Sequence, residues 1–241
     1  ISHRPFSYFL FFFIVWPFGA CLYSLQYANE RKSYAIFFLF SLLICWHMAP
    51  VSLSNKYDDF IGIYQRFLNM KITTDEMLRQ VGAYFTFSRE APKEIYEIIV
   101  TWFVKQFTNN YHFYFLVCSI PVAYFQLKSL KLITDDSKFK AGTLMGIIVL
   151  FLFIFPRDIF TVQNPRFTTG FWLCIVCTLH YLCSNRNNIF LLFPILFAPL
   201  IHSALWLYVI IIVIYLFIPK KSIILQWCAV CTLPLMFFTT D

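Results

Sequence analysis

The composition of the chain predicts an all-α fold, a polytopic helical membrane protein with about 7–8 spans. Of its 241 residues, 60% are hydrophobic and only 13% are charged, whereas soluble domains carry about 25% charged residues. The chain contains 31 phenylalanines, and a soluble fold of this size could not hide so much apolar surface. A third observation is that the apolar residues gather in long runs separated by polar loops.

Seven apolar runs have a length that suits a membrane helix, which needs about 20 residues. They cover residues 5–24, 34–49, 111–127, 141–155, 165–182, 189–218 and 223–238. The run 189–218 is too long for one ordinary span and short for two, and Pro199, His202 and Ser203 interrupt it. It fits either a tight helical pair that meets at His202 or a broken helix.

The charge distribution assigns a side of the membrane to each loop. The formal net charge is +7, and most of the basic loop residues follow alternate spans. These residues are Arg31, Lys32, Lys128, Lys131, Lys138, Lys140, Arg186, Lys220 and Lys221. If the run 189–218 is a hairpin, all these loops fall on one side, and the positive-inside rule makes that side the cytoplasm. Residues 50–110, the loop 157–164 and the turn at His202 then share the outer face.

The outer-face segment, residues 50–110, contains three predicted amphipathic helices. Apolar residues recur at helical spacing in residues 59–69, and Thr73 with Glu76 forms a capping box in front of a second helix. A third helix starts near Pro92. We expect one face of it to point inward, namely Ile95, Ile98, Ile99, Trp102 and Phe103, opposite a stripe of Glu94, Glu97, Thr101 and Lys105. All three helices are expected to lie at the membrane interface.

Residues 1–241 are expected to form a single multi-pass membrane domain, because no internal repeat or low-complexity linker divides them. The chain begins at Ile1 rather than at a methionine, and it ends in an apolar run. We therefore expect it to be a piece of a longer protein.

No metal and no soluble nucleotide is predicted as a cofactor. The chain has eight cysteines, and the two CxxC spacings, Cys174/Cys177 and Cys228/Cys231, lie inside apolar segments, where we interpret them as packing residues. With six glycines the chain has no phosphate-binding glycine-rich loop. The sequence therefore favours a lipid-linked donor, and because its basic residues serve membrane orientation, no nucleic acid is predicted as a partner.

A polar break at residues 155–170 predicts an anion-binding site. Asn164 is a favoured N-cap and Pro165 suits the first helical position, so together they open a helix whose free N–H groups attract anions. Arg166 adds a guanidinium at this helix start, where a positive charge is unfavourable unless an anion lies nearby. Arg157 is a plausible second phosphate ligand. The alternative is that Arg166 reaches the membrane interface as an orientation anchor.

Three further residues are candidates for acid–base chemistry. Asp59 and Glu94 stand at predicted helix starts, where a carboxylate is stabilising in itself but could also deprotonate a sugar hydroxyl. His202 lies at the tip of the apolar pair, and an ionisable group at membrane depth is a functional candidate by default. Candidate contacts to a sugar or an acceptor are Asp58, Tyr64 and Arg66.

Four motifs occur in a characteristic order along the chain. They are an Asp-x-x-Tyr type loop at Asp58/Asp59 with Tyr64, a helix headed by Glu94, an Asn-x-Arg helix start at Asn164 and Arg166, and the sequence His202-Ser203-Ala204. This order resembles the EpsG family of bacterial polysaccharide-biosynthesis membrane proteins, which is related to the Wzy-type polymerases. The resemblance covers residues 34–216, and family members are usually longer.

The resemblance implies a GT-C-like glycosyltransferase of the bacterial inner membrane with its site on the outer face. Such a polymerase transfers a glycan from a polyprenyl-diphosphate carrier to a lipid-linked repeat unit in capsule, exopolysaccharide or O-antigen synthesis. Its partners would be polyprenyl-diphosphate-linked oligosaccharide, the lipid bilayer and other polysaccharide-assembly proteins. The diphosphate ligands would be Arg166, Arg157 and Asn164, and the catalytic residues Asp59, Glu94 and His202.

Other functions are open on the sequence alone. A transporter or flippase of lipid-linked oligosaccharide would need charges along a path through the membrane, and the middles of the predicted spans carry almost none. A ligase would share the chemistry of a polymerase. An acyltransferase would need a histidine paired with a carboxylate in the membrane, and His202 has no carboxylate adjacent in sequence.

Overall fold

A computed structural model describes residues 5–25, 27, 30–47, 59–89, 91–92, 94–135, 165–183 and 188–217. These residues form α-helices and 3-10 helices, and no strand occurs among them. The prediction of an all-α fold is confirmed for this part of the chain. The predicted spans 141–155 and 223–238 lie outside the described residues, as do Asp58, Arg157 and Asn164.

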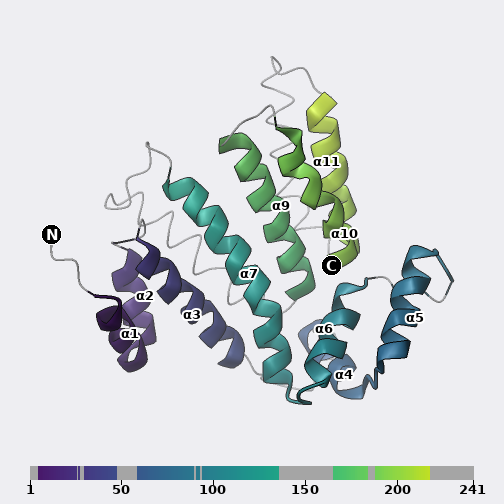
Figure 1. Cartoon of the computed structure of the whole chain (residues 1–241), viewed down its shortest axis with the longest axis horizontal. Helices are drawn as coiled ribbons and strands as arrows, with labels where there is room; N and C mark the ends of the chain where they lie inside the picture. Colours follow the sequence, from purple (N-terminus) through teal and green to yellow (C-terminus); the bar gives the residue numbers. More distant parts are fainter. Residues whose placement is uncertain are drawn as a thin grey trace.

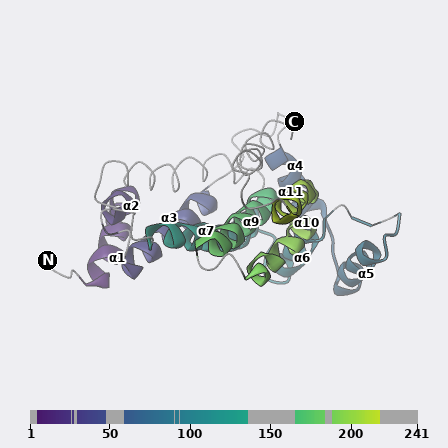
Figure 2. The ribbon, with the colours of Figure 1, turned by 90° about the horizontal axis from the view of Figure 1, so that it is seen from above.

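Three long helices lie side by side at the centre of the molecule: α3 (Arg31–His47), α7 (Tyr111–Thr134) and α9 (Pro165–Cys183) (Figure 1). Seen from above, the helices follow one another in a row (Figure 2). α7 is in the middle and packs against both of its neighbours. Small buried residues such as Ser119 and Ser129 let those neighbours come close. Their hydroxyls donate to carbonyls of the preceding turn of α7 and are thereby satisfied.

α7 is the helix that suits a membrane best. Its 24 residues extend over about 36 Å, compared with a hydrocarbon core of about 30 Å. By length and composition it is the one helix of the described residues that could cross a bilayer, while Phe6–Val15, Ile189–Ile201 and Ser203–Leu216 are shorter apolar helices. The larger number of spans stays a prediction from hydropathy.

The prediction that residues 5–24 form one span is wrong. The chain forms two short helices there, α1 (Phe6–Val15) and α2 (Pro17–Leu25). They fold back on each other, so that the rings of Phe9 and Tyr27 lie 6.0 Å apart between centroids, whereas a continuous helix would separate these residues by about 27 Å. Each helix is about 15 Å long and too short to cross a bilayer by itself.

The physical reason for this break lies at Trp16 and Pro17. Proline has no N–H to donate and its ring clashes with the preceding turn, so Pro17 ends α1 and begins α2. Gly19 then leaves room for the indole of Trp16, because a Cβ at position 19 would overlap that ring. A hydropathy window does not register such a break, since every residue around it is apolar.

The run after α9 folds into a helical pair that meets at His202, which was one of two predicted alternatives. One arm consists of η1 (Ile189–Phe197) and α10 (Ala198–Ile201), and the other of η2 (Ser203–Leu205) and α11 (Trp206–Phe217). The two arms run in opposite directions in Figure 1. His202 separates them because its backbone is extended, with φ −151° and ψ 125°.

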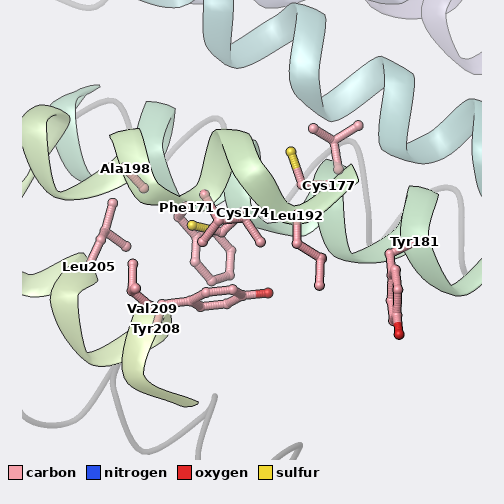
Figure 3. Packing of buried hydrophobic residues seen from close by; sticks show 11 residues of the cluster. Phe171, Cys174, Cys177, Tyr181, Leu192, Ala198, Leu205, Tyr208 and Val209 are labelled. Carbon is pink, nitrogen blue, oxygen red and sulfur yellow. The ribbon is translucent and has the colours of Figure 1, made fainter. Parts of the chain in front are cut away.

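Both arms pack with α9 around one apolar core (Figure 3). Leu192 of the first arm and Leu205 of the second are buried there beside Cys174 and Cys177. Both cysteines are free and buried, which agrees with their interpretation as packing residues. The hydroxyl of Tyr208 lies 2.9 Å from that of Thr178 and is thereby satisfied in this core.

Three short helices cover one end of the central row: α4 (Asp59–Asn69), α5 (Thr74–Phe85) and α6 (Tyr96–Lys105) (Figure 1). α4 has the predicted bounds. Ahead of α5, Thr73 Oγ1 accepts a hydrogen bond from the backbone N–H of Glu76 at 3.2 Å, as expected for its cap. The start of α9 and the turn at His202 lie at the same end. The described parts of the predicted outer-face features therefore share one end of the bundle, while residues 50–58 and the loop 157–164 lie outside the described residues.

α6 is rotated relative to the prediction. The expectation that Ile99 and Phe103 face inward is wrong, since they are 40% and 45% exposed. Ile95 and Ile98 are buried, as predicted, but the polar stripe of Glu94, Glu97 and Thr101 is buried as well. The reason is that the two carboxylates find cationic partners on α4 and α9, which an apolar face could not offer them.

Candidate functional site

Five charged or ionisable side chains from four parts of the chain meet at the end covered by α4–α6. We call them the ion-pair cluster: Arg66 of α4, Glu94 and Glu97 at the start of α6, Arg166 of α9, and His202 between the two apolar arms. Ion pairs within the cluster join residues that are 31 and 69 positions apart in the sequence, and the adjoining contact of Glu94 with Ser203 joins residues 109 positions apart. The cluster therefore exists only because the helices assemble around it.

Glu97 is the bridge between two arginines. Its Oε1 accepts a hydrogen bond from Arg66 Nε at 2.8 Å, and its Oε2 accepts one from Arg166 Nη1 at 2.7 Å. The Glu97 side chain is 9% exposed and that of Arg66 is 45% exposed. Arg66 is thus the member of the cluster that solvent or a ligand reaches most easily.

Arg166 is held between two carboxylates. Its Nη1 lies 2.9 Å from Glu94 Oε2 and 2.7 Å from Glu97 Oε2, and its side chain is 15% exposed. The sequence predicts an anion beside Arg166 at the start of α9. In this structure the carboxylates of Glu94 and Glu97 are that anion. This inward engagement does not fit the alternative of an interface anchor. The buried Nε of Arg166 has no hydrogen-bond partner within the described ranges.

Glu94 Oε1 faces the turn between the apolar arms. It accepts hydrogen bonds from the backbone N–H of Ser203 at 3.2 Å and from the Ser203 hydroxyl at 3.4 Å. His202 Nε2 lies 3.6 Å from the same oxygen. Because His202 Nδ1 accepts from the backbone N–H of Ala204 at 3.2 Å, the neutral imidazole carries its proton on Nε2, toward Glu94.

The supports of the cluster come from the same helices. The backbone N–H of Ile95 donates to the carbonyl of Leu200 at 3.3 Å, which ties the start of α6 to α10. The ring of Phe167 stands edge-to-face to the imidazole of His202, with centroids 5.3 Å apart. Together with the Ser203 contacts, these hold His202 and Glu94 in one orientation.

A hydrogen bond between two hydroxyl groups joins α6 to α9 near the cluster. Tyr96 Oη lies 3.3 Å from Thr169 Oγ1. Burial raises the pKa of the Tyr96 hydroxyl well above its usual value. Tyr96 is therefore neutral at all relevant pH values and serves as a fixed hydrogen-bonding group rather than as a base.

Of the remaining predicted site residues, only Tyr64 has a side chain that the structure describes, and it does not join the cluster. The ring of Tyr64 packs edge-to-face against that of Tyr111, with centroids 4.8 Å apart. Tyr64, which is predicted to contact the acceptor, thus has a packing role in this structure. Asp59 is the first residue of α4, and the position of its side chain lies outside what the structure describes. The same holds for all of Asp58, Arg157 and Asn164.

Glu97 was not among the predicted site residues. One signal in the sequence pointed to it, because it stands three residues after Glu94 and such residues share a helix face. The sequence analysis sets that face opposite the inward apolar face, and of its residues only Glu94, at the head of the helix, is predicted to belong to the site.

The cluster suits acid–base and anion chemistry without a metal ligand set. Across the described part of the chain, no three His, Cys, Asp or Glu side chains are grouped as a metal site requires. Two arginines face two carboxylates, so the charges balance with a neutral His202. An anionic ligand that displaced a carboxylate from an arginine would upset this balance and free a base.

Comparison of the chain with protein-family models, with curated proteins and with solved structures finds no match. The resemblance to the EpsG family thus remains a hypothesis that rests on its motifs. Function has to be argued from the cluster itself.

Proposed function

We propose that the protein is a membrane glycosyltransferase that acts as a polysaccharide polymerase. It would transfer a glycan from a polyprenyl-diphosphate carrier to a lipid-linked repeat unit at the outer face of a bacterial inner membrane. The proposal includes the multi-pass, GT-C-like architecture predicted from hydropathy. It also includes other polysaccharide-assembly proteins as partners.

One observation carries the proposal: Arg166 and His202 both contact Glu94, in a buried cluster at one end of an apolar helix bundle. Transfer from a diphosphate carrier needs a cation for the leaving group and a base for the acceptor hydroxyl. The cluster supplies both kinds of group. The exposed Arg66 adds a second guanidinium beside Glu97, on the accessible side.

In the proposed reaction the acceptor hydroxyl oxygen attacks the anomeric carbon of the donor. The bond between this carbon and the diphosphate oxygen breaks, and the electron pair leaves with the polyprenyl diphosphate. Arg166 and Arg66 stabilise the negative charge on that leaving group. The hydroxyl proton passes to Glu94, and His202 Nε2–H orients the Glu94 carboxylate through the contact at 3.6 Å.

Donor binding would also release Glu94 from its ion pair. Glu94 Oε2 and Arg166 Nη1 lie 2.9 Å apart, and a diphosphate that binds Arg166 would take the place of this carboxylate. Glu94 would then face the acceptor hydroxyl without a competing guanidinium.

A second candidate function, an O-acyltransferase, gains support from the same geometry. The sequence showed no carboxylate adjacent to His202, but the fold brings Glu94 to within 3.6 Å of it. The tautomer of His202 disfavours an acyltransferase, because a catalytic base at His202 would need an Nε2 without a proton. We therefore prefer the glycosyltransferase, with Glu94 rather than His202 as the base.

The test is polymer length in a deletion strain of the source bacterium that carries plasmid-borne variants. We expect Arg166→Ala to abolish long polymer on gels while single repeat units accumulate on lipid. Arg166→Lys keeps the charge but loses the planar fork, and it should shorten the chains. Polymer chains of normal length in Arg166→Ala, with normal abundance of the protein in the membrane, would contradict the proposal.

Two controls separate function from folding. Arg79→Ala removes an exposed arginine of α5 that pairs with Glu76 outside the cluster, and it should leave chain lengths unchanged. Glu94→Gln keeps the size of the side chain but cannot take a proton. Loss of long polymer in Glu94→Gln fits a glycosyltransferase, whereas normal chains that lack ester-linked acyl groups by NMR would identify an acyltransferase.

A further inference from the structure

A groove between α3 and α7 lies at the end of the bundle opposite the ion-pair cluster. It has a volume of about 620 Å³, which is within the range of small-molecule pockets. The hydroxyls of Tyr34 and Thr134, 2.7 Å apart, join the start of α3 to the end of α7 at this place. The groove is therefore a fixed feature of the helix pair.

The walls of the groove are apolar and its rim is basic. Phe38 and Leu39 of α3 face Leu127 of α7 across it, and Lys128 and Lys131 line its α7 side. Both lysines are exposed. The Lys128 ammonium lies 5.9 Å from the centre of the Tyr124 ring, which is a cation–π contact.

Among the described residues, no carboxylate pairs with the two ammonium groups. Neither lysine forms an ion pair there, and the described carboxylates near this end are Glu30 and Asp135. Arg31 and Lys32 are two further basic residues at the start of α3, so the described residues of this end include four basic and two acidic ones.

We infer that this groove binds an anionic phospholipid, with an acyl chain along the apolar wall and the phosphate between Lys128 and Lys131. Two observations carry the assignment: the apolar lining of the groove suits a hydrocarbon chain, and the two exposed lysines that border it complement an anionic headgroup. Lys131 stands one turn before the end of α7 and Lys128 two turns before it, a depth at which a lysine reaches the headgroup level. The inference needs the bundle to lie in a bilayer, but it does not depend on the reaction at the opposite end.

The test is native mass spectrometry of the purified full chain in detergent, titrated with phosphatidylglycerol or phosphatidylcholine. We expect retention of phosphatidylglycerol to exceed that of phosphatidylcholine. Each of Lys128→Gln and Lys131→Gln should weaken phosphatidylglycerol binding about 5-fold, and the double variant about 30-fold. Leu39→Trp, which fills the groove without a change of charge, should weaken binding as well.

A matched control is Lys71→Gln, which removes an exposed lysine between α4 and α5 at the other end of the molecule. Its affinity for phosphatidylglycerol should equal that of the unchanged protein. An equal loss in Lys71→Gln would show non-specific attraction and overturn the inference. So would equal retention of both lipids, displacement by inorganic phosphate at the lipid's own concentration, or unchanged binding in Leu39→Trp.

Discussion

Glu97 holds the candidate site together, because its two carboxylate oxygens bind two arginines from different helices. Glu97→Gln keeps the size of the side chain but removes the negative charge, so that Arg166 loses one of its two anionic partners in a buried position. Breaking a buried ion pair costs about 3–5 kcal/mol. Because Arg66 is half-exposed, we expect the lower end, about 3 kcal/mol, or roughly 6–12 °C in Tm. Thermal unfolding in detergent measures it.

Arg79→Gln is the matched control for this prediction, since its ion pair with Glu76 has the same chemistry but is exposed. Exposed pairs contribute little, so its Tm should hardly move. Equal shifts in the two variants would mean that the cluster does not stabilise the assembly. A neutral Arg166→Gln added to Glu97→Gln should recover part of the loss, because the unpaired buried charge is then gone.

Single residues of this site could be predicted, but their pairing could not. Glu94, Arg166 and His202 each stood out because a charge in an apolar chain is rare and costly. Glu97 was not recognised as a site residue, because the sequence of α6 has an apolar stripe and a polar stripe and does not show which of them is buried. That depends on Arg66 and Arg166, which lie 31 and 69 residues away. Local spacing cannot predict contacts at such separations.

At the scale of elements, the crossing of α9 and η2 depends on Gly170. A Cβ at this position would overlap the side chain of Leu205 and would lie 3.4 Å from the carbonyl oxygen of Ala198. Leu205 is fully buried, so it cannot move aside into solvent. We expect Gly170→Ala to destabilise the fold by about 1–3 kcal/mol through overpacking, as measured by thermal unfolding.

Gly82 gives the opposite expectation from the same substitution. It lies within α5, and no atom stands within 4 Å of where its Cβ would be. Alanine is the better helix former, by about 1 kcal/mol in a helix interior. Gly82→Ala should therefore leave the protein as stable or more stable. A comparable loss of stability at both glycines would contradict the steric account of Gly170.

The stability of α5 should depend on pH through Glu76. Hydrogen bonds from Arg79, which has the larger effect, and from Gln80 lower the pKa of its carboxyl from 4.5 to about 2. Because the folded state favours the ionised form, the stabilisation by this exposed pair, which is small, is fully present above pH 4.5 and is lost as the pH falls through about 2. An NMR titration of the Glu76 side chain measures the pKa directly. Arg79→Gln should move it back toward 4.5, and an unchanged value in that variant would refute the assigned cause.

Helix boundaries were predictable where a local signal marks them. The helical spacing in residues 59–69 predicted α4, Thr73 marked the start of α5, and Pro165 is the first residue of α9. The first predicted span failed because hydropathy sums over residues and does not weigh Pro17. Whether an apolar run of 20 residues crosses a membrane or folds back depends on backbone geometry and on partners for its ends.

At the scale of the whole molecule, the bundle has two chemically different ends. The helices α4–α6, which carry part of the ion-pair cluster, lie at one end, and the start of α3 and the end of α7 lie toward the other (Figure 1). Arg31 and Lys32 belong to the start of α3, and Lys128 and Lys131 belong to the last two turns of α7. The charge rule predicted this separation, because it depends on counting residues and not on their contacts.

This polarity leads to a prediction about orientation in cells. Positions 71 and 31 are both exposed and belong to opposite ends of the bundle. If the basic end faces the cytoplasm, the new cysteine of Lys71→Cys lies outside the cell and that of Arg31→Cys lies inside. A membrane-impermeant maleimide should label Lys71→Cys in intact cells, but Arg31→Cys only after permeabilisation. Cys21, Cys45, Cys118, Cys174 and Cys177 are buried, and the unchanged protein measures the background. The reverse labelling pattern would place the cluster in the cytoplasm, where a polymerase of the proposed kind could not meet its exported substrate.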